Sequence, residues 1–108
     1  MAFPTDNETW VIEAGDDIIH KEAKAGVASL TPKERLIYCL WVADYGMRNA
    51  GDLDTASDVY QGFQKEAAEV AKALSLDFAH ATFALPKENL QREYFGRFER
   101  LCDEIKKA

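Results

Sequence analysis

Apolar residues recur every three or four positions along most of the chain, a spacing typical of amphipathic helices. No segment alternates apolar and polar residues over the length of a strand, and the common hairpin turns Asn-Gly and Asp-Gly do not occur. The pattern therefore predicts an all-α fold, a compact bundle of four main helices plus a short fifth. We expect residues 1–108 to form one domain, in which 1–29 hold an acidic N-terminal helix and 30–108 form the bundle core.

The clearest helix start is at Thr31. Its side chain can accept a hydrogen bond from a free backbone amide, a proline occupies the first helical position, and Glu34 completes a capping box. The run that follows, residues 36–43, is apolar or amphipathic on every side, so we expect this helix to lie at the centre of the bundle. It is predicted to end near Gly46 or Gly51.

The other helices follow from the same pattern. The first is predicted from about Asn7 to Ala25, with Gly26 as its stop. A third begins within 52–57 and continues to about Leu74, a short segment covers 76–84, and Pro86 opens the last helix. The residues that define their inner faces are Trp10, Val11, Ala14 and Ile18; Val59, Phe63, Ala67, Val70 and Leu74; and Leu90, Tyr94, Phe98, Leu101 and Ile105.

Charge is distributed unequally along the chain. Of the net charge of −6, all lies in residues 1–58, which hold 11 carboxylates and five basic side chains, while residues 59–108 are neutral. A net negative chain repels phosphate, so we expect no direct binding of nucleic acid. Arg92, Arg97 and Arg100 form a local basic patch, with Glu93 and Glu99 interleaved.

The acidic half is a candidate surface for a basic partner. The alternative is a solvated helix face with no partner. An exposed Trp10 would favour partner binding, and a buried one would favour packing. The candidate partner-binding residues are Asp6, Glu8, Glu13, Asp16, Asp17, Asp44, Arg48, Asp52, Asp54 and Asp58.

Three of these carboxylates, at positions 52, 54 and 58, resemble the start of a calcium loop. The turn glycine of such a loop would fall on Ser57 and its bidentate glutamate on Phe63, so the calcium motif is incomplete. Carboxylates also favour the start of a helix, where they cap free amides and oppose the helix dipole. Capping is the preferred interpretation, and no metal is expected.

Asp44 and Arg48 are one helical turn apart and allow two interpretations. The first is an ordinary i,i+4 ion pair on the helix surface. The second is a half-buried pair that, with Tyr45 and Asn49, fixes a loop over 46–53 for binding.

No catalytic or cofactor motif is present, so we expect no enzyme activity and no cofactor. Cys39 and Cys102 lie in apolar patterns, which favours buried free thiols in a reducing cytoplasm over a disulfide between helices. His20 and His80 have no neighbouring ligands at metal-binding spacing. No apolar run approaches the roughly 20 residues of a membrane span, and no signal peptide is visible.

From Leu30 onward the layout resembles the bacterial DNA-mimic protein family and its uncharacterised helical relatives. The residues that carry the resemblance are the capped helix start at 30–38, the polar turn 48–52, the small-residue helix tail 68–79 and the aromatic segment 94–98. The resemblance implies a small helical protein, often a dimer. Some members present carboxylates where DNA presents phosphates, and so occupy a DNA-binding protein.

The leading hypothesis is therefore a non-enzymatic, acidic interaction protein that binds a basic or DNA-binding protein. One alternative is a self-associating protein, such as a homodimer, in which Tyr38, Trp41 and Tyr45 supply an aromatic surface. A further alternative is a small-molecule or enzymatic pocket near Asp44, Arg48 and His80.

Overall fold

The computed structural model describes residues 6–108, apart from the side chain of Val27. Over this range it contains six α-helices, one short 3-10 helix and no strand. The all-α class is confirmed, whereas the predicted count of four main helices plus a short fifth is wrong. The elements are α1 (Asp6–Ala25), η1 (Val27–Ser29), α2 (Pro32–Ala50), α3 (Leu53–Val59), α4 (Phe63–Ala73), α5 (Asp77–Phe83) and α6 (Lys87–Lys106).

The additional helix arises because the segment predicted as one helix up to about Leu74 is divided into α3 and α4. Tyr60 leaves the helical region with φ −147° and ψ 96°, and Gly62 adopts a left-handed φ of 82°. A left-handed residue interrupts a right-handed helix, and glycine adopts this conformation without a Cβ penalty. Val59 therefore ends α3 with 42% of its surface exposed, instead of joining the inner stripe of a longer helix.

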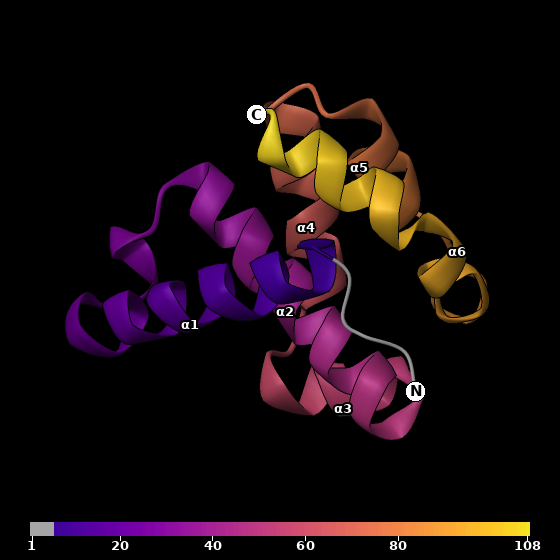
Figure 1. The fold of residues 1–108 in the computed structure, drawn as a ribbon, viewed down its shortest axis with the longest axis horizontal. Helices are drawn as coiled ribbons and strands as arrows, with labels where there is room; N and C mark the ends of the chain where they lie inside the picture. The colour runs from indigo at the N-terminus through magenta and orange to yellow at the C-terminus, as the bar shows by residue number, and fades with distance from the viewer. Residues whose placement is uncertain (1–5) are drawn as a thin grey trace.

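The central position predicted for α2 is confirmed, because it contacts α1, α3, α4 and α6 (Figure 1). Its capping box is also present. The amide of Glu34 donates to Thr31 Oγ1 at 3.1 Å, and the amide of Thr31 donates to Glu34 Oε1 at 2.9 Å. At the other end Gly51 caps the helix, since its N–H donates to the carbonyls of Gly46 and Met47.

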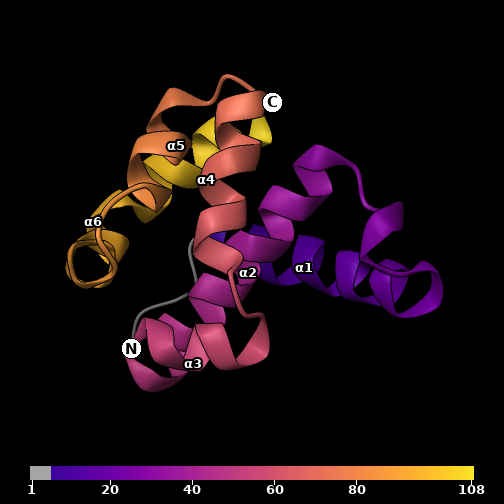
Figure 2. The ribbon, with the colours of Figure 1, turned by 180° about the vertical axis from the view of Figure 1, so that it is seen from behind.

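In the second half of the chain α5 packs against both α4 and α6, and this α4–α6 group joins the centre of the bundle mainly through α4, which packs against α2 (Figures 1 and 2). Glu104 of α6 caps the start of α5, because its carboxylate accepts the amides of Phe78 at 3.1 Å and Ala79 at 2.7 Å. The inner stripe predicted for the last helix is buried as expected. Its members are Leu90, Tyr94, Phe98, Leu101 and Ile105.

Helix α1 lies antiparallel along α2, and its C-terminal end extends away from the α4–α6 group (Figure 1). Two ion pairs set this alignment: Arg48 Nη1 lies 2.6 Å from Glu8 Oε1, and Lys21 Nζ lies 2.8 Å from Glu34 Oε1. Between these pairs Trp41 fills the space beside the backbone of α1 at Gly15. A Cβ on Gly15 would lie 2.2 Å from Trp41 Cδ1, so the close approach requires glycine.

The start of α1 is also bound to α6. Asn7 is buried, and its amide nitrogen donates to Glu99 Oε1 at 2.7 Å and to Asp103 Oδ1 at 3.2 Å. Both partners lie more than 90 residues away in the sequence. The N-terminal helix is therefore packed against both the central and the last helix.

The two cysteines, Cys39 and Cys102, are buried and free, which confirms the prediction for the thiols. Within residues 6–108, no helix combines the length and the apolar character needed to cross a membrane.

The contact between Gly15 and Trp41 gives a matched test. Gly15→Ala is expected to lower the free energy of unfolding by about 1–3 kcal/mol, because the added methyl overpacks the α1–α2 interface. Gly96→Ala, in α6, meets open space and is expected to raise it by about 0.5–1 kcal/mol through the helix preference of alanine. Urea denaturation of both variants measures the two effects. A neutral or stabilising Gly15→Ala would contradict the close approach.

Candidate functional site

The buried carboxylate of Asp44 joins α2 to α6. Asp44 is 5% exposed, and its Oδ1 accepts a 2.7 Å hydrogen bond from the hydroxyl of Tyr94, which is fully buried. Arg48 Nε donates to Oδ1 at 2.9 Å and to Oδ2 at 3.0 Å. Burial, and then the negative charge of Asp44, raise the pKa of Tyr94 well above its ordinary value. Tyr94 therefore remains a neutral hydrogen-bond donor at physiological pH.

Arg48 extends this cluster to a third helix. Its guanidinium pairs with Glu8 of α1 and lies over the rings of Phe95 and Phe98 of α6, at 5.2 and 4.8 Å from their centroids. One side chain thus contacts α1 and α6 while it is anchored on α2 through Asp44. The half-buried Asp44–Arg48 pair that the sequence suggested exists. The residues that it contacts belong to the packed helices α1 and α6.

The loop expected over 46–53 is not a loop. Helix α2 continues to Ala50, and only Gly51 and Asp52 separate it from α3. Asn49 donates from its side-chain nitrogen to the carbonyl of Tyr45 at 2.8 Å, within the same helix. The hypothesis that Asp44 and Arg48 hold a binding loop at this position is therefore wrong, because α2 continues to Ala50 and ends at the Gly51 cap.

The α3 carboxylates have separate roles. Asp52 caps α3 by accepting the amide of Thr55 at 2.9 Å, which confirms the capping interpretation, and this bond lowers the pKa of Asp52. Asp54 pairs with Lys87 of α6, and Asp58 is exposed. Across the part of the chain that the structure describes, no three His, Cys, Asp or Glu residues are placed to hold a metal ion.

The α1 carboxylates form the other group of acidic candidates. Asp6, Glu13, Asp16 and Asp17 are exposed, and the described residues place no cation within ion-pair distance of them. At 3.6 residues per turn they fall within about 100° of one another, on the side opposite the buried Val11 and Ile18. We call these four residues the α1 acidic face.

An apolar side chain, Ile12, borders the α1 acidic face, because helix periodicity places it about 40° from Asp16. Ile12 is 51% exposed, and Tyr45, on the neighbouring helix α2, is 43% exposed. Tyr45 belongs to an aromatic row on α2. The ring centroid of Trp41 lies 5.6 Å from that of Tyr45 and 6.4 Å from that of Tyr38. Trp10 does not join this surface, because it packs against the core and Lys106 Nζ lies 5.2 Å from its ring centroid. Its position supports the packing interpretation of Trp10.

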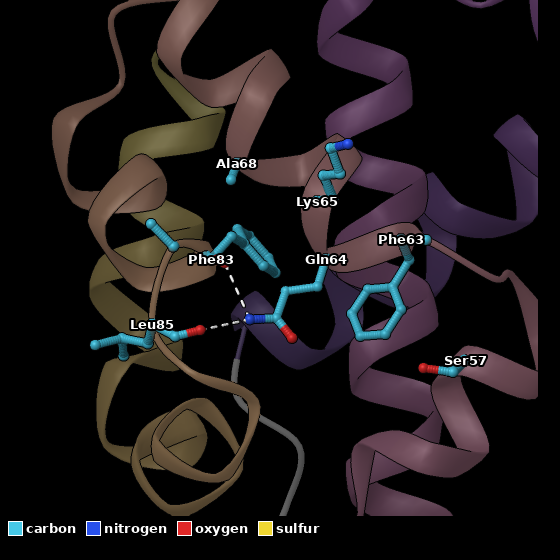
Figure 3. Close-up of a pocket in the computed structure, with 9 residues that line it drawn as sticks. Ser57, Phe63, Gln64, Lys65, Ala68, Phe83 and Leu85 are labelled. Atoms are coloured by element: carbon cyan, nitrogen blue, oxygen red, sulfur yellow. Dashed lines mark hydrogen bonds between the residues drawn. The ribbon is translucent and has the colours of Figure 1, made fainter.

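A cavity of about 480 Å³ lies where α3, α4 and the end of α5 meet (Figure 3). Gln64 reaches across it, and its side-chain nitrogen donates to the carbonyls of Phe83 at 3.0 Å and Leu85 at 2.7 Å. The rest of the lining is Ser57, Gly62, Phe63, Lys65, Ala68 and Ala84. Gln64 is engaged with the carbonyl of Phe83, the last residue of α5, and with that of Leu85 just beyond the helix, so its role is structural.

The pocket expected near Asp44, Arg48 and His80 is not assembled in this form. Asp44 and Arg48 are together, but His80 lies on α5, and no hydrogen bond or ion pair joins its side chain to either of them within the described range. None of the three lines the cavity at Gln64 or the second cavity, between α5 and α6.

A polar cluster that the sequence did not reveal surrounds Glu66 of α4. Its carboxylate accepts hydrogen bonds from the thiol of Cys39 at 3.3 Å and from the hydroxyl of Tyr60 at 2.9 Å. Burial, and then the charge of Glu66, raise the pKa of Cys39 far above the ordinary thiol value. Burial raises the pKa of Cys102 to about 12. Neither thiol is placed to act as a nucleophile, since attack requires the thiolate.

Comparison with family models, with curated proteins and with solved structures found no match to this chain. The resemblance to the DNA-mimic family therefore stays a prediction.

Ionisation of the buried Tyr94 and the partly buried Tyr60 should destabilise the fold at high pH. The folded-state pKa of Tyr94 lies well above 10 and that of Tyr60 is about 12. The unfolded chain therefore loses these protons first, and their contribution, complete below about pH 10, declines as the pH rises beyond it. Denaturant unfolding from about pH 8, below the ordinary tyrosine pKa, to about pH 11.5, above it, measures the slope.

Tyr94→Phe is expected to cost about 1–3 kcal/mol at neutral pH, because Asp44 loses a donor, and to flatten the alkaline slope. Tyr45→Phe removes an exposed hydroxyl and is the matched control, with an expected change within about 0.5 kcal/mol. Equal costs and equal slopes for the two variants would contradict the assigned role of the Tyr94 hydroxyl.

The thiols give a second test. Cys39 and Cys102 should not react with a disulfide reagent in the native protein at about pH 8, the range in which an ordinary thiol begins to ionise. Both should react once guanidinium unfolds the chain. The coloured product released by the reagent gives the number of reactive thiols per chain in the native and in the unfolded protein. Rapid labelling of either cysteine in the native protein would disprove its assigned burial.

Proposed function

We propose that this protein is a non-enzymatic interaction protein that binds a basic protein surface through the α1 acidic face. The observation that carries the proposal is the exposure of four carboxylates on one side of a single helix, with no ion pair to any described cation. The other acidic candidates differ, because Glu8, Asp44 and Asp54 are paired within the fold, Asp52 caps α3, and the exposed Asp58 lies on a different helix from this face. Unpaired like charges on one face attract a cationic partner at long range.

Exposed apolar residues on α1 and on the neighbouring α2 support a partner that carries apolar side chains as well as charge. The pairs Glu8–Arg48 and Lys21–Glu34 align α1 and α2 so that Ile12 lies at the level of Tyr45. Ile12 and Tyr45 are the most exposed large apolar side chains on these two helices. Charges mainly accelerate association, while apolar contacts limit dissociation, so a basic amphipathic segment fits this surface better than a purely cationic one.

The charge density limits how closely this face could imitate DNA. The α1 acidic face covers residues 6–17, about 17 Å at the helical rise of 1.5 Å. Duplex DNA carries about ten charges over that length. Four carboxylates on one chain are fewer than half of these. Mimicry of DNA would need a homodimer that joins two such faces, so the proposal concerns a basic protein surface in general.

The alternatives have less support. In an enzymatic role Asp44 would have to release Tyr94 and Arg48, which occupy its oxygens. Self-association through the aromatic row would use mainly Tyr45, since Tyr38 and Trp41 are partly covered by neighbouring residues. The free buried thiols fit a reducing compartment such as the cytoplasm.

Binding to a synthetic amphipathic helix of lysine and leucine tests the proposal. The triple variant Glu13→Gln, Asp16→Asn, Asp17→Asn should weaken binding roughly tenfold at low salt, because three surface attractions are lost. Rising salt should weaken binding to the parent chain. Calorimetric titration at two salt concentrations measures both effects.

The matched control neutralises the exposed acids Asp58, Glu69 and Glu88, which gives the same net charge. It should bind nearly as tightly as the parent chain. An equal loss in both triple variants would show attraction to overall charge only, and no binding at low salt would remove the proposal. If light scattering detects a dimer that Tyr45→Ala dissociates while neither triple variant affects peptide binding, self-association would be the better account.

A further inference from the structure

A second cavity, of about 440 Å³, lies between α5 and α6, and three of its six lining residues are arginines. Its lining residues are Phe78, Arg92, Glu93, Gly96, Arg97 and Arg100. It shares no residue with the α1 acidic face. Its basic lining is unusual in a protein of net charge −6 and calls for a separate explanation.

Helix periodicity places the basic residues around a glycine. Arg92, Gly96 and Arg100 follow one another at intervals of four, so they share one side of α6. Gly96 is in the middle of a 20-residue helix, where glycine is less stable than alanine by about 1 kcal/mol. A Cβ at this position would meet no atom within 4 Å, so no packing contact explains the glycine. Its absent side chain leaves the cavity open at the helix backbone.

Two of the arginines are held against the ring of Phe78. The guanidinium carbon of Arg100 lies 4.2 Å from the ring centroid, and that of Arg97 lies 5.3 Å from it. The backbone of Phe78 is itself held, because its amide donates to Glu104. The guanidinium groups of Arg97 and Arg100 are therefore partly oriented before any ligand arrives, which lowers the entropy lost on binding.

The three arginines differ in their ionic partners. Arg97 is neutralised by Glu93, with Nε and Nη2 each 3.1 Å from Oε1, and its Nη1 donates to Thr82 at 3.2 Å. Arg92 and Arg100 have no carboxylate within 4 Å among the described residues. Two cations are thus available at the cavity, next to a third that is fixed in place.

The chemistry of this arrangement matches a phosphate group. A phosphate monoester carries about −1.5 to −2 charges at neutral pH, which two arginines can balance. The guanidinium fork donates parallel hydrogen bonds to phosphate oxygens. The cavity volume is within the roughly 300–1,000 Å³ range of small-molecule sites, so it has room for more than the phosphate alone.

We propose that the α5–α6 cavity binds a small organic phosphate, with Arg92 and Arg100 donating to the phosphate group above Gly96. A nucleic-acid strand fits less well, because Glu93 lines the same cavity and the whole chain repels a polyanion.

Nuclear magnetic resonance titration tests the proposal on the full chain. The probes are glucose 6-phosphate and adenosine monophosphate, with glucose and adenosine as phosphate-free controls, inorganic phosphate, and a single-stranded oligonucleotide. The phosphate monoesters should shift the Gly96 amide and the Arg92 and Arg100 side-chain signals, and the phosphate-free compounds should not. No shift with either monoester at about 10 mM would overturn the proposal.

Variants separate the cavity from general charge. Arg92→Gln with Arg100→Gln should weaken binding of the monoesters roughly tenfold or more. The matched control Lys24→Gln with Lys72→Gln removes the same charge from exposed positions and should leave the affinity unchanged. Gly96→Ala should weaken binding although it stabilises the helix. Equal effects of both double variants would overturn the proposal, as would tighter binding of the oligonucleotide than of the monoesters.

Discussion

The arrangement of the helices depends on one buried carboxylate. Asp44 receives hydrogen bonds from Tyr94 of α6 and from Arg48 of its own helix, and Arg48 continues to Glu8 of α1. An unpaired carboxylate at this position would be strongly destabilising, so the three helices must meet in the register that supplies its partners. Apolar burial drives the collapse of the bundle, and this polar contact selects among the ways in which the helices could pack.

The charges of the chain then fall into two groups. The charges of one group make contacts within the fold: Asp52 caps α3, Asp54 pairs with Lys87, and Glu66 accepts two hydrogen bonds. The second group lies at the surface, where carboxylates line the outer side of α1 and arginines line the α5–α6 cavity. The asymmetry of charge along the sequence thus has a partial counterpart in space, confined to α1. Two proposals of opposite polarity follow from this division, and they involve different helices.

Local signals were sufficient for most helices and insufficient for the polar contacts. The capping box at Thr31 and the cap at Asp52 involve residues three positions apart, so the sequence displays them directly. The break at Gly62 was missed, because the apolar spacing continues across it and only the backbone conformation reveals the turn. The bond from Tyr94 to Asp44 spans 50 residues. No periodicity encodes such a pairing, since it depends on how whole helices pack.

The most direct test of this account is a pair of double-mutant cycles on the free energy of unfolding. The cycle of Asp44→Ala with Tyr94→Phe should give a coupling energy of about 1–3 kcal/mol, because the contact is buried and joins two helices. The cycle of Asp54→Ala with Lys87→Ala should give about 0–1 kcal/mol, because that ion pair is exposed. A coupling near zero for the buried pair, or a larger one for the exposed pair, would contradict the claim that the buried Asp44 contact holds the helices in their register.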